Sequence, residues 1–496
     1  MTDAWRPLAL LALSCLAACG GHERSTLASA SDIASLPNTP GVTPFIAFIP
    51  LTGKSLSAVT SISYVIEPRP GAVSNPVSVQ FSIAGLRGRG YVTADTVTLP
   101  VFGLYAGYAN QVSIQLTFTD ASRQFIARVL STAAYTDPNG IYDQPTILKK
   151  RPAGSRLGFD FIAVKSSLGT PVIVDTDGEL RWVAVGVDSS SSSILNDNGF
   201  DIGGSTDTTF YRLELDGTVT KTTLASPEYI RFHHNIDRGR DGLLAELDTA
   251  TDTESTISAL TPTGGFGKEW DLARLLADYM LAQGDDPSAF VRPGTDWFHS
   301  NDAVYDARDN SLIVSSRENF LIKLDYDSGA IIWILGDPTK YWYTFPSLRA
   351  KALTVVGTGL YPIGQHAVSF TNDGLLMVFN NGFPSVSQPV GAPTGSSRAY
   401  SAVSAYRIDP VARTAEEAWR FDYGQTVFTP ICGSAYQAAD DSLIVDYPAV
   451  DSSSHMRLVG LDDQRAVVFD LQYASPGGCT AGWNAAPIHL EQMQFR

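Results

Sequence analysis

The sequence is short of charged residues, basic clusters and cysteines, and each shortage excludes a class of protein. Only 17% of its 496 residues are charged and 44% are hydrophobic, which is typical of a globular chain and excludes a disordered one. Acidic residues outnumber basic ones, 51 to 35, and no basic run stands out, so we expect no nucleic-acid partner. The apolar stretch from Leu8 to Leu16 is too short for a transmembrane helix.

The N-terminus has the pattern of an export signal. "MTDAWRPLALLALSCLAACGGHERST" combines Arg6 with that short apolar stretch, which predicts a secretory signal peptide over residues 1–18. "LAAC" before "GG" resembles a bacterial lipobox, so we expect cleavage before Cys19 and a lipid on its sulfur. Cleavage of an ordinary signal peptide near Ala18 is the alternative. Residues 19–40 have the composition of a flexible tether, so the lipid would be the protein's only membrane contact.

Two of the four cysteines, Cys432 and Cys479, lie far beyond this segment. An exported protein passes through an oxidising compartment, where cysteines commonly pair. A disulfide between them is therefore the favoured interpretation, and two buried free thiols are the alternative.

Residues 41–148 predict a small β-sandwich. Short alternating runs such as "SISYVIEPRP", "VSVQFSIAG" and "QVSIQLTFTD" are bounded by Pro, Gly and Asn. The segment has no cluster of titratable residues. We interpret it as a packing or assembly domain.

Residues 149–496 contain a long, irregular repeat whose second half is a hairpin. Its copies are "TPVIVDTDGELRWVAV", "FYRLELDGTVTKTTL", "ISALTPTGGFGKEWDL", "LIKLDYDSGAIIWILG", "AYRIDPVARTAEEAWRF" and "RLVGLDDQRAVVFDL". Most have an Asp/Gly turn between alternating apolar residues, and each follows another strand pair. Repeated four-stranded units predict an all-β protein with a six-bladed β-propeller after the sandwich. One helix is predicted within "DLARLLADYMLAQGD", where Leu272, Leu275, Leu276 and Tyr279 share a face.

Three of the seven histidines occupy equivalent positions in the first half of the repeat. They begin "HNIDRGRDGLLAEL" at His234, "HSNDAVYDARDNSLIVSS" at His299 and "HAVSFTNDGLLMVF" at His366, while the last repeat has Ser434 there. The first strand of each propeller blade lines the central channel, so these histidines should converge at one mouth. Arg317, at the end of the returning strand after His299, should lie near the same mouth.

A zinc site is the competing interpretation of three converging histidines. Arg317 and the neutral Asn301 argue against it, since a cation beside a metal is unfavourable and no carboxylate clearly accompanies the histidines. We therefore expect no metal. Imidazoles with a guanidinium suit a tetrahedral oxyanion, and imidazole can act as a nucleophile or as a general acid or base.

Longer stretches of the sequence resemble the bacterial arylsulfate sulfotransferases. They include "DWFHSNDAVYDARDNSLIVSSRENFLIKLDYDSGAIIWILGD", "GQHAVSFTNDGLLMVFNNG" and "LPVFGLYAGYANQVSIQLTF", and the likeness covers nearly all of the expected mature chain. The resemblance implies a periplasmic homodimer that pairs a six-bladed propeller with an N-terminal sandwich. It also implies transfer of a sulfuryl group from a phenolic sulfate ester to a phenol, without a cofactor or a nucleotide donor.

The resemblance also assigns roles to single residues. His366 of "GQH" matches the histidine that is transiently sulfated, and Arg317 of "SSRE" matches the arginine that binds the sulfate oxygens. His299 and Asn301 of "HSN" match a pair that contacts the transferred group. A further site histidine comes from "FHHN"; the register of the repeat favours His234 over His233, and both stay candidates. The family often has a closely spaced cysteine pair, unlike Cys432 and Cys479.

The aromatic insertion at residues 337–365 connects the repeat of His299 to that of His366. We expect Tyr341 and Trp342 within it to contact the substrate's ring. Packing between blades or at a dimer contact is the alternative. Two other functions also stay open: a sulfatase that uses water as the acceptor, and a propeller that binds ligands without chemistry.

Overall fold

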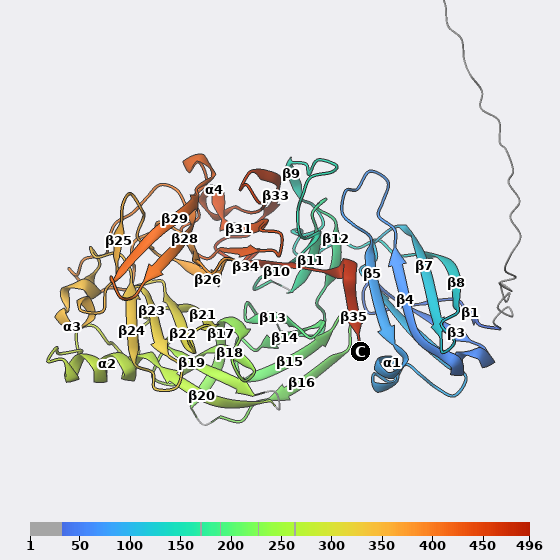
Figure 1. Cartoon of the computed structure of the whole chain (residues 1–496), viewed down its shortest axis with the longest axis horizontal. Helices are drawn as coiled ribbons and strands as arrows, with labels where there is room; N and C mark the ends of the chain where they lie inside the picture. Colours follow the sequence, from blue (N-terminus) through green and yellow to red (C-terminus); the bar gives the residue numbers. More distant parts are fainter. Residues whose placement is uncertain (1–31, 169–170, 189, 227, 262–263) are drawn as a thin grey trace, which may run out of the picture.

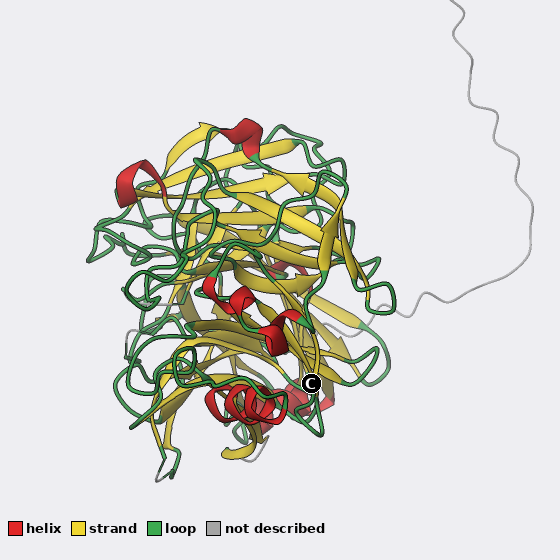
Figure 2. Cartoon of the chain, turned by 90° about the vertical axis from the view of Figure 1, so that its left-hand side faces the viewer, coloured by secondary structure: helices red, strands yellow, loops and turns green. Residues whose placement is uncertain are grey.

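The computed structural model describes residues 32–168, 171–188, 190–226, 228–261 and 264–496. The predicted signal peptide, Cys19 and the first part of the predicted tether lie outside this range. Within it the fold is all-β, and the helices are few and short (Figure 2). None of the helices in the described ranges is long and apolar enough to cross a membrane.

The N-terminal segment forms two sheets. One consists of β1 (Ala34–Ser35), β3 (Ile46–Thr52), β2 (Thr39–Pro40) and β6 (Thr96–Phe102), and η1 (Lys54–Ala58) follows β3. The other has the order β35 (Met493–Phe495), β5 (Val77–Ser82), β4 (Val59–Ile66), β7 (Ala109–Phe118) and β8 (Arg123–Ser131), with α1 (Ile83–Gly88) after β5. Alternate residues of both sheets are buried in one apolar core, as the alternating pattern predicts.

Six further sheets follow in the described part of the chain. The first is β12 (Leu180–Val183), β11 (Val172–Asp175), β10 (Phe161–Lys165) and β34 (Asn484–Ile488); the second is β13 (Ser193–Asn196), β14 (Gly199–Gly203), β15 (Thr209–Glu214) and β16 (Val219–Thr223). The third is β17 (Tyr229–Arg238), β18 (Leu243–Thr249), β19 (Thr256–Thr261) and β20 (Gly265–Asp271); the fourth is β21 (Ser300–Asp306), β22 (Ser311–Ser316), β23 (Leu321–Asp325) and β24 (Ile331–Leu335).

The last two sheets have five strands each. The fifth is β25 (Thr354–Val356), β29 (Thr414–Phe421), β28 (Ala402–Asp409), β27 (Leu376–Asn380) and β26 (His366–Phe370). The sixth is β30 (Ser434–Gln437), β31 (Leu443–Ala449), β32 (His455–Leu461), β33 (Val467–Ala474) and β9 (Thr146–Lys149). The remaining helices are α2 (Leu272–Ala282), η2 (Tyr341–Thr344), α3 (Pro346–Arg349), η3 (Tyr423–Gln425), α4 (Val450–Ser453) and η4 (Leu490–Gln492).

All six predicted hairpins are confirmed; four are the outer pair of their sheet, and in the two five-stranded sheets β25 or β9 adds a further strand outside the hairpin. They are β11–β12, β15–β16, β19–β20, β23–β24, β28–β29 and β32–β33. The first turn shows why Asp and Gly recur: the Asp175 carboxylate accepts the backbone N–H groups of Asp177 and Glu179, and Gly178 has φ 91°. The predicted helix is also confirmed as α2, with Leu272 and Leu276 buried.

The edge strands β13, β17, β21, β26, β30 and β34 lie next to one another in that order. Three strands pair with strands that are distant in the sequence: β34 pairs with β10, β9 with β33, and β35 with β5 of the N-terminal segment (Figure 1). The strands β9 and β35 therefore join the two parts of the chain on either side of the boundary predicted at residues 148 and 149.

A buried arginine attaches the N-terminal segment to the first of the six sheets. Arg181 pairs with Asp175 at 2.9 Å, and two of its nitrogens donate to the carbonyl oxygen of Gly103. Its guanidinium also lies 3.7 Å from the centre of the Tyr105 ring. The buried charge of Arg181 is tolerated because these contacts replace the hydration that it loses. Apolar residues of the N-terminal segment and of the first of the six sheets also belong to one hydrophobic core.

We predict that Phe495→Ala in β35 lowers the free energy of unfolding by about 3–5 kcal/mol, because a large buried ring is lost. Phe495 stacks on Phe81 at 4.6 Å between ring centres and is 5% exposed. Denaturant titration measures the change. Val411→Ala, at a residue 94% exposed, is the control and should alter stability by no more than about 0.5 kcal/mol. Equal stability of the two variants would contradict this role for β35.

Candidate active site

A cavity of about 310 Å³ brings together the residues that the repeat pattern singled out. Its walls include His234, His299, His366 and Arg317, which come from the third, fourth and fifth sheets. The other lining residues are Ser167, Ser191, Ile431, Cys432, Cys479, Thr480 and Trp483. The predicted convergence of three histidines and one arginine is therefore what the structure shows.

His234 and His366 lie at β-bulges of edge strands, and His299 directly precedes a strand with a bulge near its start. The register shifts between His233 and Ile236 in β17, between Ser300 and Asp302 in β21, and between His366 and Val368 in β26. Positive φ angles accompany the bulges: 40° at His234, 54° at His299 and 46° at Ala367. Non-glycine residues rarely adopt this conformation, and such strain clusters at functional sites.

His366 presents one ring nitrogen to the cavity side and holds the other in hydrogen bonds. Its Nδ1 lies 2.8 Å from Oδ1 of Asn381 and 3.0 Å from the carbonyl oxygen of Gly364. Its Nε2 accepts a hydrogen bond from the backbone N–H of Cys432 at 3.1 Å. Burial, followed by the Arg317 charge, lowers the pKa of His366 to about 3. The imidazole is therefore neutral, with its lone pair on Nε2.

Asn381 determines this tautomer, although the sequence analysis did not single it out. Its amide nitrogen donates to the carbonyl oxygens of Thr429 at 2.9 Å and Cys432 at 2.8 Å. The amide oxygen must then face His366 as an acceptor, so Nδ1 carries the proton. The neighbouring asparagines of "FNNG" offered no sequence signal that separates Asn381 from Asn380.

His299 is the cationic member of the group. Its Nδ1 lies 2.6 Å from Asp296 and 2.7 Å from Glu254. Burial opposes the charge, but the hydrogen bonds to Asp296 and Glu254 outweigh it and raise the pKa of His299 to about 9. At neutral pH the ring is therefore protonated, and its Nε2–H is the donor left for a ligand.

His234 lines the cavity, whereas His233 is not among the lining residues. The Nδ1 atom of His234 lies 3.6 Å from Glu254 and 3.8 Å from Glu246, and its ring packs on Trp483 at 4.4 Å. Burial, reinforced by the neighbouring His233, lowers the pKa of His234 well below its ordinary value. His233 instead bonds to Glu254 through Nε2 at 2.8 Å.

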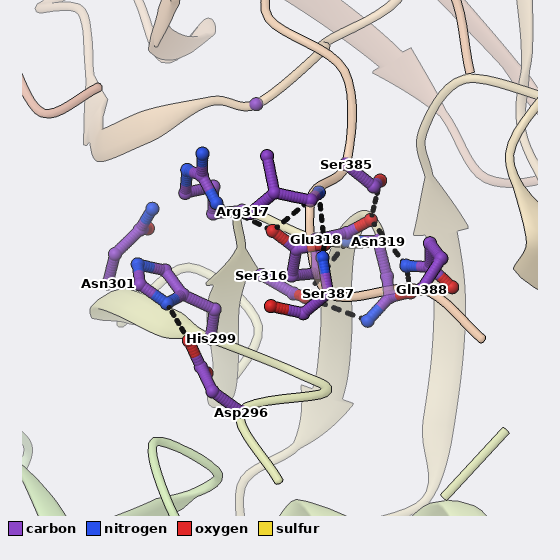
Figure 3. A network of polar contacts seen from close by, with 12 residues as sticks. Asp296, His299, Asn301, Ser316, Arg317, Glu318, Asn319, Ser385, Ser387 and Gln388 are labelled. Carbon is purple, nitrogen blue, oxygen red and sulfur yellow. Dashed lines mark hydrogen bonds and ion pairs between the residues drawn. The ribbon is translucent and has the colours of Figure 1, made fainter. Parts of the chain in front are cut away.

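Arg317 is held in place by Glu318, which is fully buried (Figure 3). Nη1 of Arg317 contacts the Glu318 carboxylate at 2.6 Å. That carboxylate also accepts the backbone N–H groups of Val386 and Ser387 at 2.9 and 2.8 Å. Within the described residues, Nε of Arg317 has no hydrogen-bond partner. One side of the guanidinium is thus fixed by the protein, and Arg317 holds its charge at the wall of the cavity, where an anion can bind.

Asn301 is held between the strands of His299 and His366. Its Nδ2 donates to the carbonyl oxygen of Gln365 at 2.8 Å, and its Oδ1 has no partner in the described part of the chain. Figure 3 draws it beside His299. Asn301 is not among the residues lining the cavity, so its predicted contact with the transferred group stays a prediction.

The segment around Cys479 supplies a wall that sequence reasoning missed. Cys432 and Cys479 form a disulfide, with 1.99 Å between their sulfur atoms, and both line the cavity. The bond joins the loop whose N–H contacts His366 to the loop that leads to Trp483. Trp483 offers an aromatic surface 6.4 Å from the His366 ring. No repeat pattern marks this tryptophan.

The structure corrects the expectation for Trp342 and Tyr341. Trp342 is 1% exposed, packs edge-on against Phe320 at 5.3 Å and donates from Nε1 to the carbonyl oxygen of Asp337. Tyr341 packs against Phe345 and Phe290 in the same aromatic cluster. Neither lines the cavity, because burying these large rings fills the space beside α2 instead.

A second correction concerns carboxylates. From the sequence, no carboxylate clearly accompanied the histidines, yet each of three carboxylates lies within 4 Å of an imidazole: Glu254, Glu246 and Asp296. Glu254 lies in the loop between β18 and β19, and Asp296 lies three residues before His299. Only folding brings Glu254 to His299, whereas Asp296 is already close to His299 in the sequence.

Two sequence profiles of known protein families match this chain. The sequence profile of the arylsulfotransferase family matches residues 144–480, and that of the arylsulfotransferase Ig-like domain matches residues 39–133. The chain belongs to the arylsulfotransferase family. The Ig-like match covers the two N-terminal sheets.

The chain is similar to two curated arylsulfate sulfotransferases, both named AssT. The protein of Escherichia coli O6:H1 is 30% identical to this chain in a match that covers 30% of this chain and 27% of that protein. The protein of Lelliottia amnigena is 29% identical in a match that covers 27% of this chain and 25% of that protein. The match thus spans about a quarter of these relatives. Solved structures with similarity include a dihydro-heme d1 dehydrogenase, NirN (11% identity, 86% of this chain, 75% of that chain, TM-score 0.32). Another is the Cps50 (Swd1) β-propeller of Myceliophthora thermophila, with 11% identity, coverage of 67% of this chain and 90% of that chain, and a TM-score of 0.36. These TM-scores are too low to establish a shared fold.

We predict that Asp296→Asn lowers the pKa of His299 from about 9 toward the ordinary value, because one of its two carboxylate partners becomes neutral. Titration of the histidine ring signals by NMR measures it. The raised pKa stabilises the fold fully below about pH 6.5 and loses that effect as pH rises through about 9, so the variant's stability should become less pH-dependent there.

The control is Asp286→Asn, in an exposed loop, which should leave the titration of His299 unchanged. An unchanged pKa of His299 in the Asp296→Asn protein would contradict the ion pair.

Proposed function

We propose that this protein transfers a sulfuryl group from a phenolic sulfate ester to a phenolic acceptor. The observation that carries the proposal is His366: a neutral imidazole with its lone pair on Nε2, in a cavity shared with two cations, Arg317 and His299. An enzyme for this transfer needs a nucleophile and fixed donors for the sulfate oxygens. The family and the names of the similar relatives support the same activity.

The first half-reaction uses groups that are already in position. Nε2 of His366 attacks sulfur, the S–O bond to the phenol breaks, and the electron pair leaves on the phenolic oxygen. The incoming sulfuryl group displaces the Cys432 N–H from Nε2, and that N–H can then donate to a sulfuryl oxygen. Arg317 and His234 are assigned to the remaining oxygens, and preorganised donors of this kind contribute about 3 kcal/mol each.

His299 is assigned to the leaving oxygen. Its raised pKa lies close to that of a phenol, about 10 for tyrosine, so proton transfer between them is nearly balanced. In the second half-reaction neutral His299 takes the proton of the acceptor phenol. The phenolic oxygen then attacks sulfur, and the S–N bond to His366 breaks. Donor and acceptor bind in turn, which predicts ping-pong kinetics.

The walls of the cavity fit an aromatic ring. Trp483 and Ile431 are apolar lining residues beside the histidines, and ring stacking adds about 1 kcal/mol beyond burial. A phenoxide also leaves more readily than an alkoxide, so aryl donors fit the chemistry as well as the shape.

We extend the proposal to architecture and location. The six consecutive sheets are proposed to be the blades of a six-bladed propeller, supported by the adjacent edge strands and by β34 completing the sheet of β10. The two N-terminal sheets over one core support a sandwich at residues 41–148. The disulfide suits an oxidising compartment, so we propose a periplasmic lipoprotein anchored at Cys19, active as a homodimer.

The test uses the purified protein with a nitrophenyl sulfate. Phenol-dependent release of nitrophenol, with sulfated phenol as the product, is the expected result. Release that ignores the phenol indicates hydrolysis, and no release contradicts enzymatic transfer. His366→Ala should lose donor cleavage and the sulfated protein that mass spectrometry detects without acceptor. The control His455→Ala changes a histidine outside the cavity and should leave activity unchanged.

We predict that Arg317→Lys lowers the transfer rate at least about tenfold, because lysine keeps the charge but loses the planar set of donors. Steady-state rates with the same donor and acceptor measure the effect. Arg308→Lys is the matched control: Arg308 pairs with Asp306 and is half-exposed, so its replacement should leave the rate unchanged. A full rate in the Arg317→Lys enzyme would show that the fork geometry is not needed.

A further inference from the structure

Four ligand-type atoms beside the cavity are buried without a hydrogen-bond partner. Both carboxylate oxygens of Glu246 and the Nδ1 atoms of His233 and His234 lack one in the described residues. Glu246 is 1% exposed, so its carboxylate is not in contact with bulk solvent. Burying such groups without a partner is costly, which makes this cluster the least explained part of the site.

Charge makes the cluster harder to satisfy without a ligand. Glu246 and Asp302 are buried acidic residues of this region, and Asp237 and Lys165 beside them are half-buried. Lys165 is bound by Asn235 at 2.6 Å, and Asn235 in turn contacts Asp302 at 2.7 Å. Glu246 is thus left without a direct cationic partner in this network.

We propose that His233, His234 and Glu246 bind a zinc ion. His233 and Glu246 face each other across neighbouring strands β17 and β18, and the bulge places His234 beside them. Nδ1 of His234 lies 3.8 Å from Glu246 Oε2, close to the separation of about 3.4 Å between two ligands of tetrahedral zinc. Two imidazole nitrogens and a carboxylate favour zinc over calcium or magnesium.

The surroundings of His233 match those of a metal ligand. Its Nε2 is 2.8 Å from the Glu254 carboxylate, which holds the proton on Nε2 and leaves a lone pair on Nδ1, an atom without a hydrogen-bond partner in the described residues. One ring nitrogen each of His233 and His234 and one Glu246 oxygen lie within 4.8 Å of one another. Histidine ligands in proteins commonly donate their other ring N–H to a carboxylate in this way. Glu254 also contacts His299 at 2.7 Å, so one carboxylate connects the zinc cluster to the catalytic cavity.

Zinc would also fix the tautomer of His234. With Nδ1 bound to the ion, the proton must lie on Nε2, the ring nitrogen left for the cavity. His234 then donates a hydrogen bond to a sulfate oxygen. This consequence rests on the proposed function, whereas binding of zinc does not.

The test is the metal content of the full exported chain. The protein is treated with a chelator, dialysed, mixed with excess zinc sulfate and desalted; mass spectrometry should then find one zinc per chain. Calcium and magnesium should not replace it. Wild-type protein that retains no zinc overturns the proposal whatever the variants do, and leaves the sulfotransferase proposal untouched.

Glu246→Gln keeps the side-chain volume and removes the charge, so we expect zinc affinity by calorimetry to fall at least about tenfold. Glu491→Gln is the matched control, because Glu491 pairs with His489 at 2.6 Å outside the cavity; its zinc binding should equal that of the wild type. Equal affinity in the Glu246→Gln protein would also overturn the site. Cobalt substitution gives a second readout: a visible spectrum of tetrahedral cobalt in the wild type is expected, and its absence counts against the site.

Discussion

Three β-bulges at edge strands set the direction of the side chains on which the site depends. A regular strand turns successive residues to opposite faces, so a histidine at its start would point into one sheet or out of it. The bulges of β17, β21 and β26 break that alternation at or beside His234, His299 and His366, whose imidazoles all line one cavity. The left-handed backbone at His234, His299 and Ala367 costs free energy, and the strand pairing beside each bulge offsets that cost.

Once the rings converge, their hydrogen bonds make them chemically different. Burial and the Arg317 charge keep His366 neutral, and its contacts with Asn381 and the Cys432 N–H place the lone pair on Nε2. Asp296 and Glu254 keep His299 charged. The repeat therefore supplies three copies of one side chain, and non-repeated residues around the copies make the His366 imidazole neutral and the His299 imidazole cationic. The proposed transfer requires one neutral imidazole and one protonated imidazole in the same cavity.

The other wall of the cavity comes from the C-terminal part of the chain. The disulfide to Cys479 fastens this segment to the loop that contacts His366, and Trp483 then faces the histidines. Further along, β34 completes the sheet of β10 and β35 joins the N-terminal sheet. The same segment thus contributes to the site and ties together sheets formed by distant parts of the chain.

The sequence by itself determined the all-β fold, the six hairpins, the helix α2 and the convergence of His234, His299, His366 and Arg317. These follow from local periodicity and from equivalent positions in a repeat, which a linear pattern records. Only the tertiary structure decided the roles of Asn381, Glu254, Glu246 and Trp483, and it placed Trp342 in an aromatic core. Their contacts join residues far apart in the chain or depend on side-chain direction at a bulge, and no spacing in the sequence encodes either.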